Sequence, residues 1–311
     1  MLKDEVLKEL AAHRDSSLSG QVLAAKFGVS RNAVWKAIKA LESEGVEIEA
    51  VTNKGYRLAA NAWTAYDIEV PEGVSLFFYE SIDSTNTQAK RLLAEGLCSD
   101  ALVAAKEQTA GRGRCGRDFY SPKNTGIYFS YVFHPGQSLS DTVFVTTAAA
   151  VAVVRAIERI STLKPAIKWV NDIFIGNKKV CGILSEAVSD FESGRVESVI
   201  IGIGINVSTK EFPKELADTA TGLYESGITE ANLLNAVIKE LIPLVQQPCR
   251  EEILQEYKAH SLVLEKEITF IENGVSKRAK AIDIDETGGL VVMSEEGIRT
   301  LRSGEISIRL K

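Results

Sequence analysis

The 311-residue sequence predicts a multidomain α+β protein with three parts. A helical pattern with a basic stretch fills the first part, and strands and helices mix after a connection that contains Pro71 and Gly73. Short alternating strands fill the last part. Because the chain is longer than a usual single domain, we place the three parts at residues 1–62, 63–262 and 263–311.

The composition is that of an ordinary globular protein, with 45% hydrophobic residues, 25% charged residues and a net charge of −6. The N-terminal stretch MLKDEVLKEL has charges throughout, unlike a signal peptide. The longest apolar run, around Val143 to Val154, is interrupted by Thr146 and Thr147 and is too short to span a bilayer. We therefore expect a cytoplasmic protein with no membrane partner.

The cysteines indicate neither a disulfide framework nor a zinc site. They lie far apart and form no C-x-x-C pair, at Cys98, Cys115, Cys181 and Cys249. Reduced thiols are expected, and the sequence identifies no metal-ligating residues.

Residues 20–58 show the pattern of two helices, a tight turn and a small hairpin. The apolar face of the first helix is formed by Val22, Leu23 and Phe27. Ser30 is a good N-cap for the second helix. Apolar residues recur there at helical spacing, at Val34, Ile38 and Leu41. This is a helix-turn-helix, and VEIEAVTNKGYRL forms a wing with its turn at Asn53 to Gly55.

The second helix is expected to bind DNA. Residues 1–60 hold nine Lys or Arg and eight Asp or Glu, but residues 21–40 hold basic residues and no acid. The groups that face base edges and phosphates are predicted to be Arg31, Asn32, Lys36 and Lys39. In the wing, Lys54 can reach a phosphate. The other interpretation is a helical pair that only packs or dimerises. We assign Trp35 to packing, the more common role of an aromatic residue on such a helix.

The segment AGRGRCGRDFY, residues 110–120, has glycines at the spacing of a dinucleotide-binding loop. Such a loop needs a helix that begins within the motif, because pyrophosphate sits on its N-terminus. No helix is expected here, since Pro122 and a turn at residues 124–126 follow. We instead expect a flexible loop that closes over an anionic ligand, with phosphates bound by Arg112, Arg114 and Arg117. The alternative is a solvated basic loop.

The segment IKWVNDIFIGNKKVCGILSEA predicts a hairpin with a two-residue turn at Gly176-Asn177. In that register Asp172 faces Cys181, and Asp172 and Lys179 share one face about 7–8 Å apart. The two groups form either a simple cross-strand ion pair or part of a ligand site. Asn171 falls on the opposite face unless a bulge turns it.

Two further segments suggest a ligand-binding surface. VSLFFYESIDSTNTQAKRLLAEG predicts a strand and then a helix capped around Ser84 to Asn86, where free N–H groups and hydroxyls form a niche. VESVIIGIGINVS predicts a buried strand that ends at Asn206 and is interrupted by Gly202 and Gly204. Glycine weakens a strand interior, so the two glycines indicate either close approach of a ligand or backbone, or a tight packing contact.

The C-terminal residues predict a small β-barrel. Its alternating strands are separated by turns at Asn273-Gly274, Gly288-Gly289 and Glu296-Gly297. The barrel either assists acceptor or nucleotide binding or only stabilises the protein.

Five motifs behind the winged helix resemble those of the bifunctional biotin protein ligases and biotin operon repressors of bacteria. They are DSTN, QTAGRGRCGR, KWVND, KVCGIL and GIGIN, and the resemblance covers essentially the whole chain. It implies a winged helix-turn-helix, a central α/β ligase domain of the class II synthetase-like type shared with lipoate ligases, and an SH3-like C-terminal barrel.

The activity implied by the resemblance has two steps. Biotin and ATP give biotinyl-5′-AMP and pyrophosphate, and a lysine of the biotin carboxyl carrier protein then attacks the mixed anhydride. Mg²⁺ is expected to accompany ATP. The implied repressor is a homodimer that forms when the adenylate is bound and binds operator DNA.

The resemblance also implies roles for single residues. Expected to contact biotin are Ser84, Thr85, Asn86, Gln108, Arg112, Gly113, Arg114 and Lys179. Expected near ATP or the adenylate are Arg114, Arg117, Asn171, Asp172 and Asn206. Lys179 and Arg114 would offset the charge that develops as a carboxylate attacks a phosphate, and Asp172 is the candidate base for the acceptor lysine.

Two positions depart from the family pattern. The family commonly has proline at the position of Val170, and valine is expected to restore a strand hydrogen bond there because it has a backbone N–H. Cys115 occupies a variable loop position. Two other functions fit the same features: a ligand-sensing regulator without turnover, and a lipoate ligase.

Overall fold

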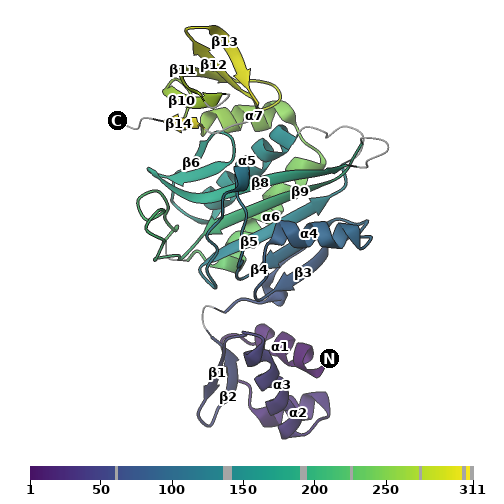
Figure 1. Cartoon of the computed structure of the whole chain (residues 1–311). Helices are drawn as coiled ribbons and strands as arrows, with labels where there is room; N and C mark the ends of the chain where they lie inside the picture. Colours follow the sequence, from purple (N-terminus) through teal and green to yellow (C-terminus); the bar gives the residue numbers. More distant parts are fainter. Residues whose placement is uncertain are drawn as a thin grey trace. The chain divides into compact units, whose positions relative to one another are not determined.

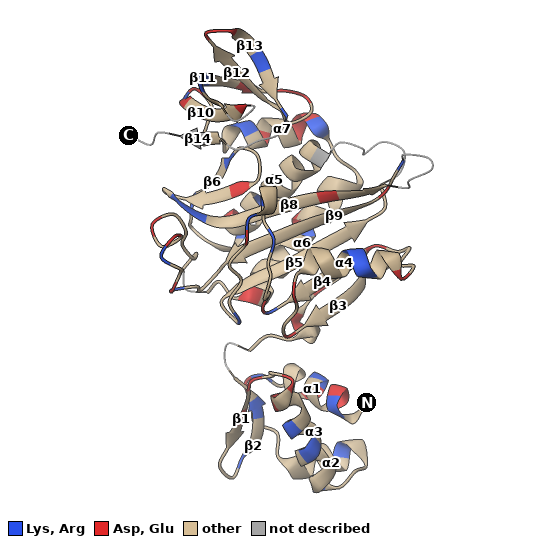
Figure 2. Ribbon diagram, viewed as in Figure 1, with Lys and Arg blue, Asp and Glu red and all other residues tan. Residues whose placement is uncertain are grey.

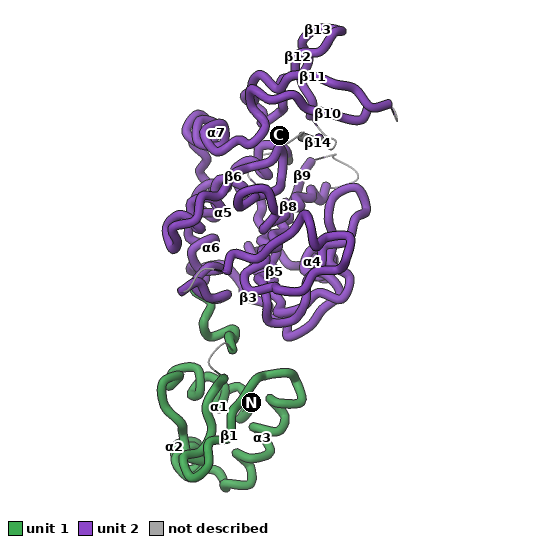
Figure 3. Tube along the Cα trace, turned by 90° about the vertical axis from the view of Figure 1, so that its left-hand side faces the viewer, with its two compact units in different colours: residues 1–69 green, residues 70–311 purple. Residues whose placement is uncertain are grey.

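The computed structural model divides the chain into two compact units, residues 1–69 and 70–311 (Figure 1, Figure 3). It describes residues 1–59, 62–135, 142–189, 195–224, 227–272, 275–302 and 306–308. Among these residues, no helix combines the length and the apolar character needed to cross a membrane.

The N-terminal unit is a winged helix-turn-helix. Its elements are α1 (Leu2–Ala12), α2 (Gly20–Phe27), α3 (Arg31–Ser43), β1 (Ile48–Val51) and β2 (Gly55–Leu58). The Ser30 hydroxyl accepts a hydrogen bond from the backbone N–H of Ala33 at 3.1 Å, which confirms the predicted N-cap of α3. The apolar residues predicted for α3, Val34, Ile38 and Leu41, are all buried.

Three features of this unit differ from the prediction. Helix α1 was not expected, and its Val6 and Leu10 complete the core. Val22 was placed on the apolar face of α2 but is 54% exposed, so Leu23 and Phe27 do the packing there. Trp35, assigned to packing, is 48% exposed because it lies outside the buried stripe of Val34, Ala37, Ile38 and Leu41.

The second unit is built on a seven-stranded sheet in the order β3-β4-β5-β9-β8-β7-β6. Its strands are β3 (Ser75–Tyr79), β4 (Ala101–Ala105), β5 (Gly126–Phe133), β6 (Pro165–Lys168), β7 (Asp172–Ile175), β8 (Lys178–Ser189) and β9 (Val196–Asn206). The β3–β4 pair is parallel and the other pairs are antiparallel. Every residue of β5 is buried, as expected of a central strand that is covered on both faces.

Helices cover both faces of this sheet (Figure 1). Helix α4 (Thr85–Ala94) lies on the face that includes Ser130 of β5, whereas α5 (Thr142–Ile160) packs on the opposite face, where Thr146 donates a hydrogen bond to Ser185 of β8. Helices α6 (Glu230–Gln246) and α7 (Arg250–Ala259) pack against α5. Because α5 is apolar around most of its circumference, it is buried between α6 and the sheet.

The hairpin of β7 and β8 turns at Gly176-Asn177, as predicted, but its register differs beyond the turn. A bulge between Ile173 and Phe174 adds a residue to β8, so Asp172 pairs with Gly182 and not with Cys181. Asp172 and Lys179 still share one face, because the bulge leaves the side of the sheet unchanged for both residues.

The C-terminal part of this unit is a five-stranded antiparallel sheet in the order β13-β12-β11-β10-β14. Its strands are β10 (Glu267–Glu272), β11 (Val275–Ile284), β12 (Leu290–Ser294), β13 (Gly297–Leu301) and β14 (Ile306–Ile308). Turns occur at Gly288-Gly289 and Glu296-Gly297, as predicted, and the turn predicted at Asn273-Gly274 lies outside the described residues.

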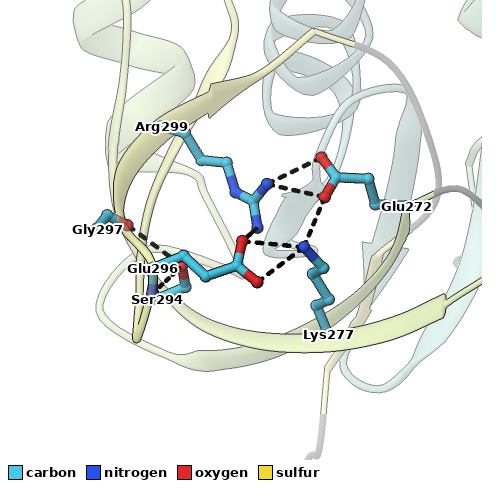
Figure 4. A network of polar contacts seen from close by, with 6 residues as sticks. All are labelled: Glu272, Lys277, Ser294, Glu296, Gly297 and Arg299. Carbon is cyan, nitrogen blue, oxygen red and sulfur yellow. Dashed lines mark hydrogen bonds and ion pairs between the residues drawn. The ribbon is translucent and has the colours of Figure 1, made fainter.

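A network of charged side chains joins the two hairpins of this small sheet (Figure 4). Arg299 contacts both carboxylate oxygens of Glu272 at 2.9 Å, and Lys277 bridges Glu272 and Glu296. The neighbouring Lys277 and Arg299 lower the pKa of the Glu272 carboxyl. The Arg299 guanidinium also lies 5.0 Å from the ring centroid of Phe270, so it covers the apolar interior of the sheet.

Because the N-terminal unit has its own core, a cavity made there should destabilise that unit. Ile38 is fully buried in α3, so Ile38→Ala should lower the unfolding free energy of the unit by about 2–5 kcal/mol. Hydrogen exchange read by mass spectrometry on the full chain should show faster exchange in residues 1–69. The control is Lys8→Ala on the exposed side of α1. Equal exchange in the two variants would contradict the core assignment.

Candidate functional site

A cavity of about 420 Å³ lies on the face of the seven-stranded sheet that is covered by α4. It is lined by the start of α4, the arginine-containing loop, the connection before β7 and the ends of β8 and β9. The predicted site residues that line it are Ser84, Thr85, Asn86, Gln108, Arg112, Gly113, Arg114, Arg117, Asn171, Asp172 and Lys179. Five motifs that are far apart in the sequence therefore meet at one place.

The niche at the start of α4 is built by hydrogen bonds between side chains of different motifs. Ser84 is the N-cap of α4, and the amide oxygen of Gln108 accepts from the backbone N–H of Thr85 at 2.9 Å and from its hydroxyl at 3.2 Å. The Gln108 amide nitrogen donates to Ser121, whose hydroxyl donates to the backbone oxygen of Phe119. These bonds fix the orientation of the polar groups before a ligand is bound.

Asn86 lies beneath this niche and is 4% exposed. Its amide nitrogen donates to Glu186 at 2.8 Å and to the backbone oxygen of Leu184 at 3.2 Å. The hydroxyl of Ser130 lies 2.6 Å from the Asn86 amide oxygen and 2.8 Å from the Thr85 hydroxyl. Asn86 thus ties α4 to the centre of the sheet.

Glycines of β8 and β9 form the floor of the cavity. Other side chains pack directly on their backbone, so a Cβ atom would collide with them. A Cβ atom at Gly204 would lie 2.4 Å from the Phe119 ring, and one at Gly202 would lie 2.1 Å from the Asn86 amide oxygen. Gly182, which pairs with Gly204, is also covered by the Phe119 ring. A tight packing contact is therefore observed at both glycines of β9, which also line the cavity.

The arginine-containing loop, residues 111–118, lies at the cavity and contains no α-helix. A short 3₁₀ turn, η2 (Arg114–Gly116), occupies its tip. Gly113 N–H donates to the Arg117 backbone oxygen at 2.7 Å, and Phe119 N–H donates to Gly111 at 2.9 Å. The prediction that no dinucleotide-type helix begins here is confirmed.

Asp172 and Lys179 form an ion pair, with 2.6 Å between Oδ1 and Nζ. The Lys179 ammonium also lies 5.9 Å from the ring centroid of Phe119. The Lys179 backbone is held from the other side, since its N–H donates to Thr219 and its carbonyl accepts from Thr221. The neighbouring Cys181 is fully buried, and this burial raises the pKa of its thiol.

Asn171 lies in the connection between β6 and β7, so strand alternation does not set its direction. Its amide nitrogen donates to the backbone oxygen of Ile183 at 2.9 Å, and its amide oxygen accepts from Arg114 at 3.2 Å. Val170 belongs to the same connection and therefore does not restore a strand hydrogen bond. Its carbonyl accepts from the buried Tyr257 hydroxyl at 3.1 Å, which anchors the connection to α7.

Of the residues predicted to contact biotin, ATP or the adenylate, Asn206 alone is not among those that line the cavity. It lies two residues beyond Gly204 on the same face of β9 and is 5% exposed. Its side-chain oxygen accepts no hydrogen bond from the residues that the structure describes.

Several cavity residues were not predicted as site residues. They are Asp118, Phe119, Lys168, Trp169, Phe174, Leu216, Thr219, Ala220 and Ile306, besides residues of β8 and β9. Lys168 and Trp169 belong to the KWVND motif, so the motif could have predicted them as site residues. Residues 216–220 and Ile306 come from segments without a motif, so only the fold could place them.

The C-terminal sheet takes part in the site. The Trp169 indole N–H donates to the backbone oxygen of Gly288 at 2.9 Å, and Ile306 of β14 lines the cavity. The Asp285 carboxylate accepts from the backbone N–H groups of Thr287 and Gly289 and so holds this turn in place. These contacts place the C-terminal sheet at the edge of the cavity.

The predicted DNA-binding residues lie apart in the N-terminal unit. All of them are exposed: Arg31, Asn32, Lys36 and Lys39 on α3, and Lys54 at the turn between β1 and β2. Figure 2 shows basic positions along α2 and α3. Lys39 forms an ion pair with Glu42 at 2.5 Å.

Models of three protein families match the chain. The biotin/lipoate A/B protein ligase family matches residues 78–206, an HTH domain matches residues 3–57, and the biotin protein ligase C-terminal domain matches residues 263–309.

Similar proteins cover nearly the whole chain. The bifunctional ligase/repressor BirA of Bacillus subtilis is 34% identical over 99% of this chain and 98% of its own length, and that of Escherichia coli is 27% identical over 94% and 92%. A solved structure of the biotin protein ligase from Aquifex aeolicus in complex with biotin and ATP has a TM-score of 0.63 at 30% identity. It covers 76% of this chain and 99% of that chain.

The glycine floor leads to a stability prediction. In Gly204→Ala, the added methyl group collides with the Phe119 ring, so the variant should lose about 1–3 kcal/mol of unfolding free energy. Gly20→Ala is the control, because its methyl group would meet Tyr56 at an ordinary 3.7 Å. Thermal unfolding measures the stability of both variants relative to the wild type. A Gly204→Ala protein as stable as the control would show that Phe119 does not rest on the sheet.

Proposed function

Because the chain belongs to the family of bifunctional biotin protein ligases and repressors, we propose that it activates biotin with ATP and transfers it to a lysine of a biotin carboxyl carrier protein. The convergence of five motifs on one cavity is the observation that supports this most strongly. We place the activity in the cytoplasm, where ATP and genomic DNA are both available.

Biotin is proposed to bind with its polar ring in the niche at the start of α4. The niche offers donors and acceptors from Ser84, Thr85 and Gln108 that are already held in place by hydrogen bonds. The cavity is also of a size typical for small-molecule sites, which span about 300–1,000 Å³. Phe119 and Trp169 add apolar surface to its wall.

In the first step, the biotin carboxylate attacks the α-phosphorus of ATP and pyrophosphate leaves. Both reactants are anions, so fixed cations must offset their repulsion. Lys179 is assigned to this position, and Arg114 is held at the same cavity through Asn171. Arg112 and Arg117, also at the cavity, would bind phosphates and help to keep the adenylate from water.

ATP is proposed to enter with Mg²⁺. This cation is usually bound by substrate phosphates together with one or two carboxylates. Asp118 and Asp172 are the carboxylates that line the cavity and would serve in that way. Asn206 is assigned to ATP because its buried oxygen lies on the same sheet face.

In the second step, the acceptor lysine attacks the acyl carbon of the adenylate, AMP leaves, and the amine loses a proton. Asp172 is our candidate for the base. Its ion pair with Lys179 gives it a further task, which is to orient the ammonium group during the first step.

Lys179→Ala should all but abolish adenylate formation, which we expect to measure as a loss of about 100-fold to 1,000-fold in the rate of biotin-dependent pyrophosphate release. The adjacent Lys178 provides a matched control, because it is exposed and its ammonium donates to the Ala217 backbone oxygen at 3.0 Å. Lys178→Ala should therefore keep the wild-type rate. A Lys179→Ala protein that stays active but melts earlier would show that Lys179 is only structural.

The same assay decides between the three candidate functions. The variant Asp172→Asn is assayed with biotin plus ATP and, separately, with preformed adenylate. The two assays show whether loss of the Asp172 carboxylate slows biotin activation or transfer to the acceptor lysine. Binding of biotin without pyrophosphate release would favour a regulator without turnover. Lipoate is included as a competing acid, because the matching family model covers both kinds of ligase.

We also propose that the adenylate-bound protein forms a homodimer that binds operator DNA and represses biotin genes. The HTH match and the basic face of α3 support DNA binding. A dimer would let two winged helices reach two half-sites of a palindrome.

Biotin plus ATP should therefore shift the protein from monomer to dimer in sedimentation velocity and tighten binding to its operator. Binding to an operator fragment is followed by gel shift with no ligand, with biotin alone, and with both. An identical shift in all three conditions would contradict the coupling between adenylate and DNA.

A further inference from the structure

Trp35 lies on the solvent face of α3 among the groups assigned to DNA. It is 48% exposed, whereas Trp63 and Trp169 are 3% and 4% exposed. The core face of α3 is formed entirely by other residues, namely Val34, Ala37, Ile38 and Leu41, which are at most 7% exposed. Trp35 therefore makes no contribution to the core of the N-terminal unit.

The neighbours of Trp35 are basic and polar. Arg31 and Lys39 lie one turn before and one turn after it, since residues four apart share a helix face. Asn32 and Lys36 form the adjoining row on the same exposed side. A single exposed apolar residue on a surface needs no explanation, but this indole lies at the centre of a basic face on the second helix of a helix-turn-helix.

We propose that Trp35 is a specificity-determining residue that contacts thymine methyl groups in the DNA major groove. The inference rests on the proposed repressor function and extends it to one side chain. Cations on this helix suit phosphates and guanine edges, whereas the C5-methyl of thymine is the apolar group of the major groove. An uncharged indole of large apolar area complements that methyl group, and the flanking Arg31 and Lys39 supply the attraction to the backbone.

The charge pattern favours DNA over a protein partner. Residues 21–40 contain four basic residues and no acid, and Arg31 and Lys36 form no ion pair within the described part of the chain. Lys54, at the exposed turn of the wing, adds a further cation to the same unit. A duplex carries dense negative charge, so it satisfies the cations and the indole together.

The test uses the full chain with biotin and ATP. A preferred duplex is first selected from random DNA by the wild-type protein, and Kd is measured on it and on a scrambled duplex of the same composition. Trp35→Ala should weaken binding to the selected duplex about 10- to 100-fold and change binding to the scrambled duplex by less than about twofold. Its ligase rate and its dimer assembly should equal those of the wild type.

Two comparison variants separate base contact from backbone contact. Trp35→Phe keeps an aromatic apolar surface and should retain most of the preference for the selected duplex. Lys36→Ala removes a cation and should weaken binding to both duplexes alike, with a smaller dependence on salt.

Replacement of single thymines by uracil in the selected duplex removes only the methyl group. At the contacted position this change should weaken the wild type several-fold and leave Trp35→Ala unaffected. Acrylamide should quench Trp35 fluorescence in the free protein, and the selected duplex should protect it.

Three outcomes would overturn the inference. They are a Trp35→Ala protein with the wild-type preference, equal losses on both duplexes, and a defect confined to dimer assembly or to the ligase rate, which would place Trp35 at a protein contact. A wild-type protein that selects no duplex would overturn the repressor function itself.

Discussion

The site depends on three glycines that leave part of one face of the sheet without side chains. Gly182, Gly202 and Gly204 lie next to one another on β8 and β9, and the side chains of Asn86 and Phe119 occupy the space where Cβ atoms would stand. This close approach brings the start of α4 and the end of the arginine-containing loop down onto the same face. Glycine costs stability in a strand, because it loses more conformational freedom on folding than other residues. Here that cost is offset by buried contacts and by the hydrogen bonds of Asn86 to β8.

The second requirement is electrostatic. A reaction that joins a carboxylate to a phosphate needs positive charge at a fixed place, and a long lysine side chain does not supply it without partners. Lys179 is held by the Asp172 carboxylate and by hydrogen bonds of its backbone to residues 219 and 221. Arg114 is held through Asn171, which is anchored to β8. The fold thus orients both cations, as the proposed reaction requires.

The C-terminal sheet is joined to this site by few but specific contacts. Its turn at Gly288 accepts the Trp169 indole N–H, and β14 places Ile306 at the cavity. A network of Glu272, Lys277 and Arg299 keeps the hairpins of the sheet together. The small sheet is therefore a wall of the cavity as well as a separate fold element.

The sequence by itself determined the elements and the chemical groups of this protein. Local spacing predicted the helix-turn-helix, the wing, the hairpin at Gly176-Asn177 and the absence of a dinucleotide-type helix, because these features depend on contacts between residues close in the chain. The motifs also predicted eleven of the residues that line the cavity. Helix α1 and the exposure of Trp35 were missed, since only the packing of the whole N-terminal unit shows which helix face is buried.

Only the tertiary structure decided how these groups meet. The bulge in β8 set the partner of Asp172, and the connection after β6 set the direction of Asn171, because both depend on hydrogen bonds to distant strands. Ile306 and residues 216–220 reached the cavity through sheet pairing that leaves no local pattern in the sequence. Periodicity reports which side of one element is buried, whereas the distance between two elements is fixed by the packing of all the others.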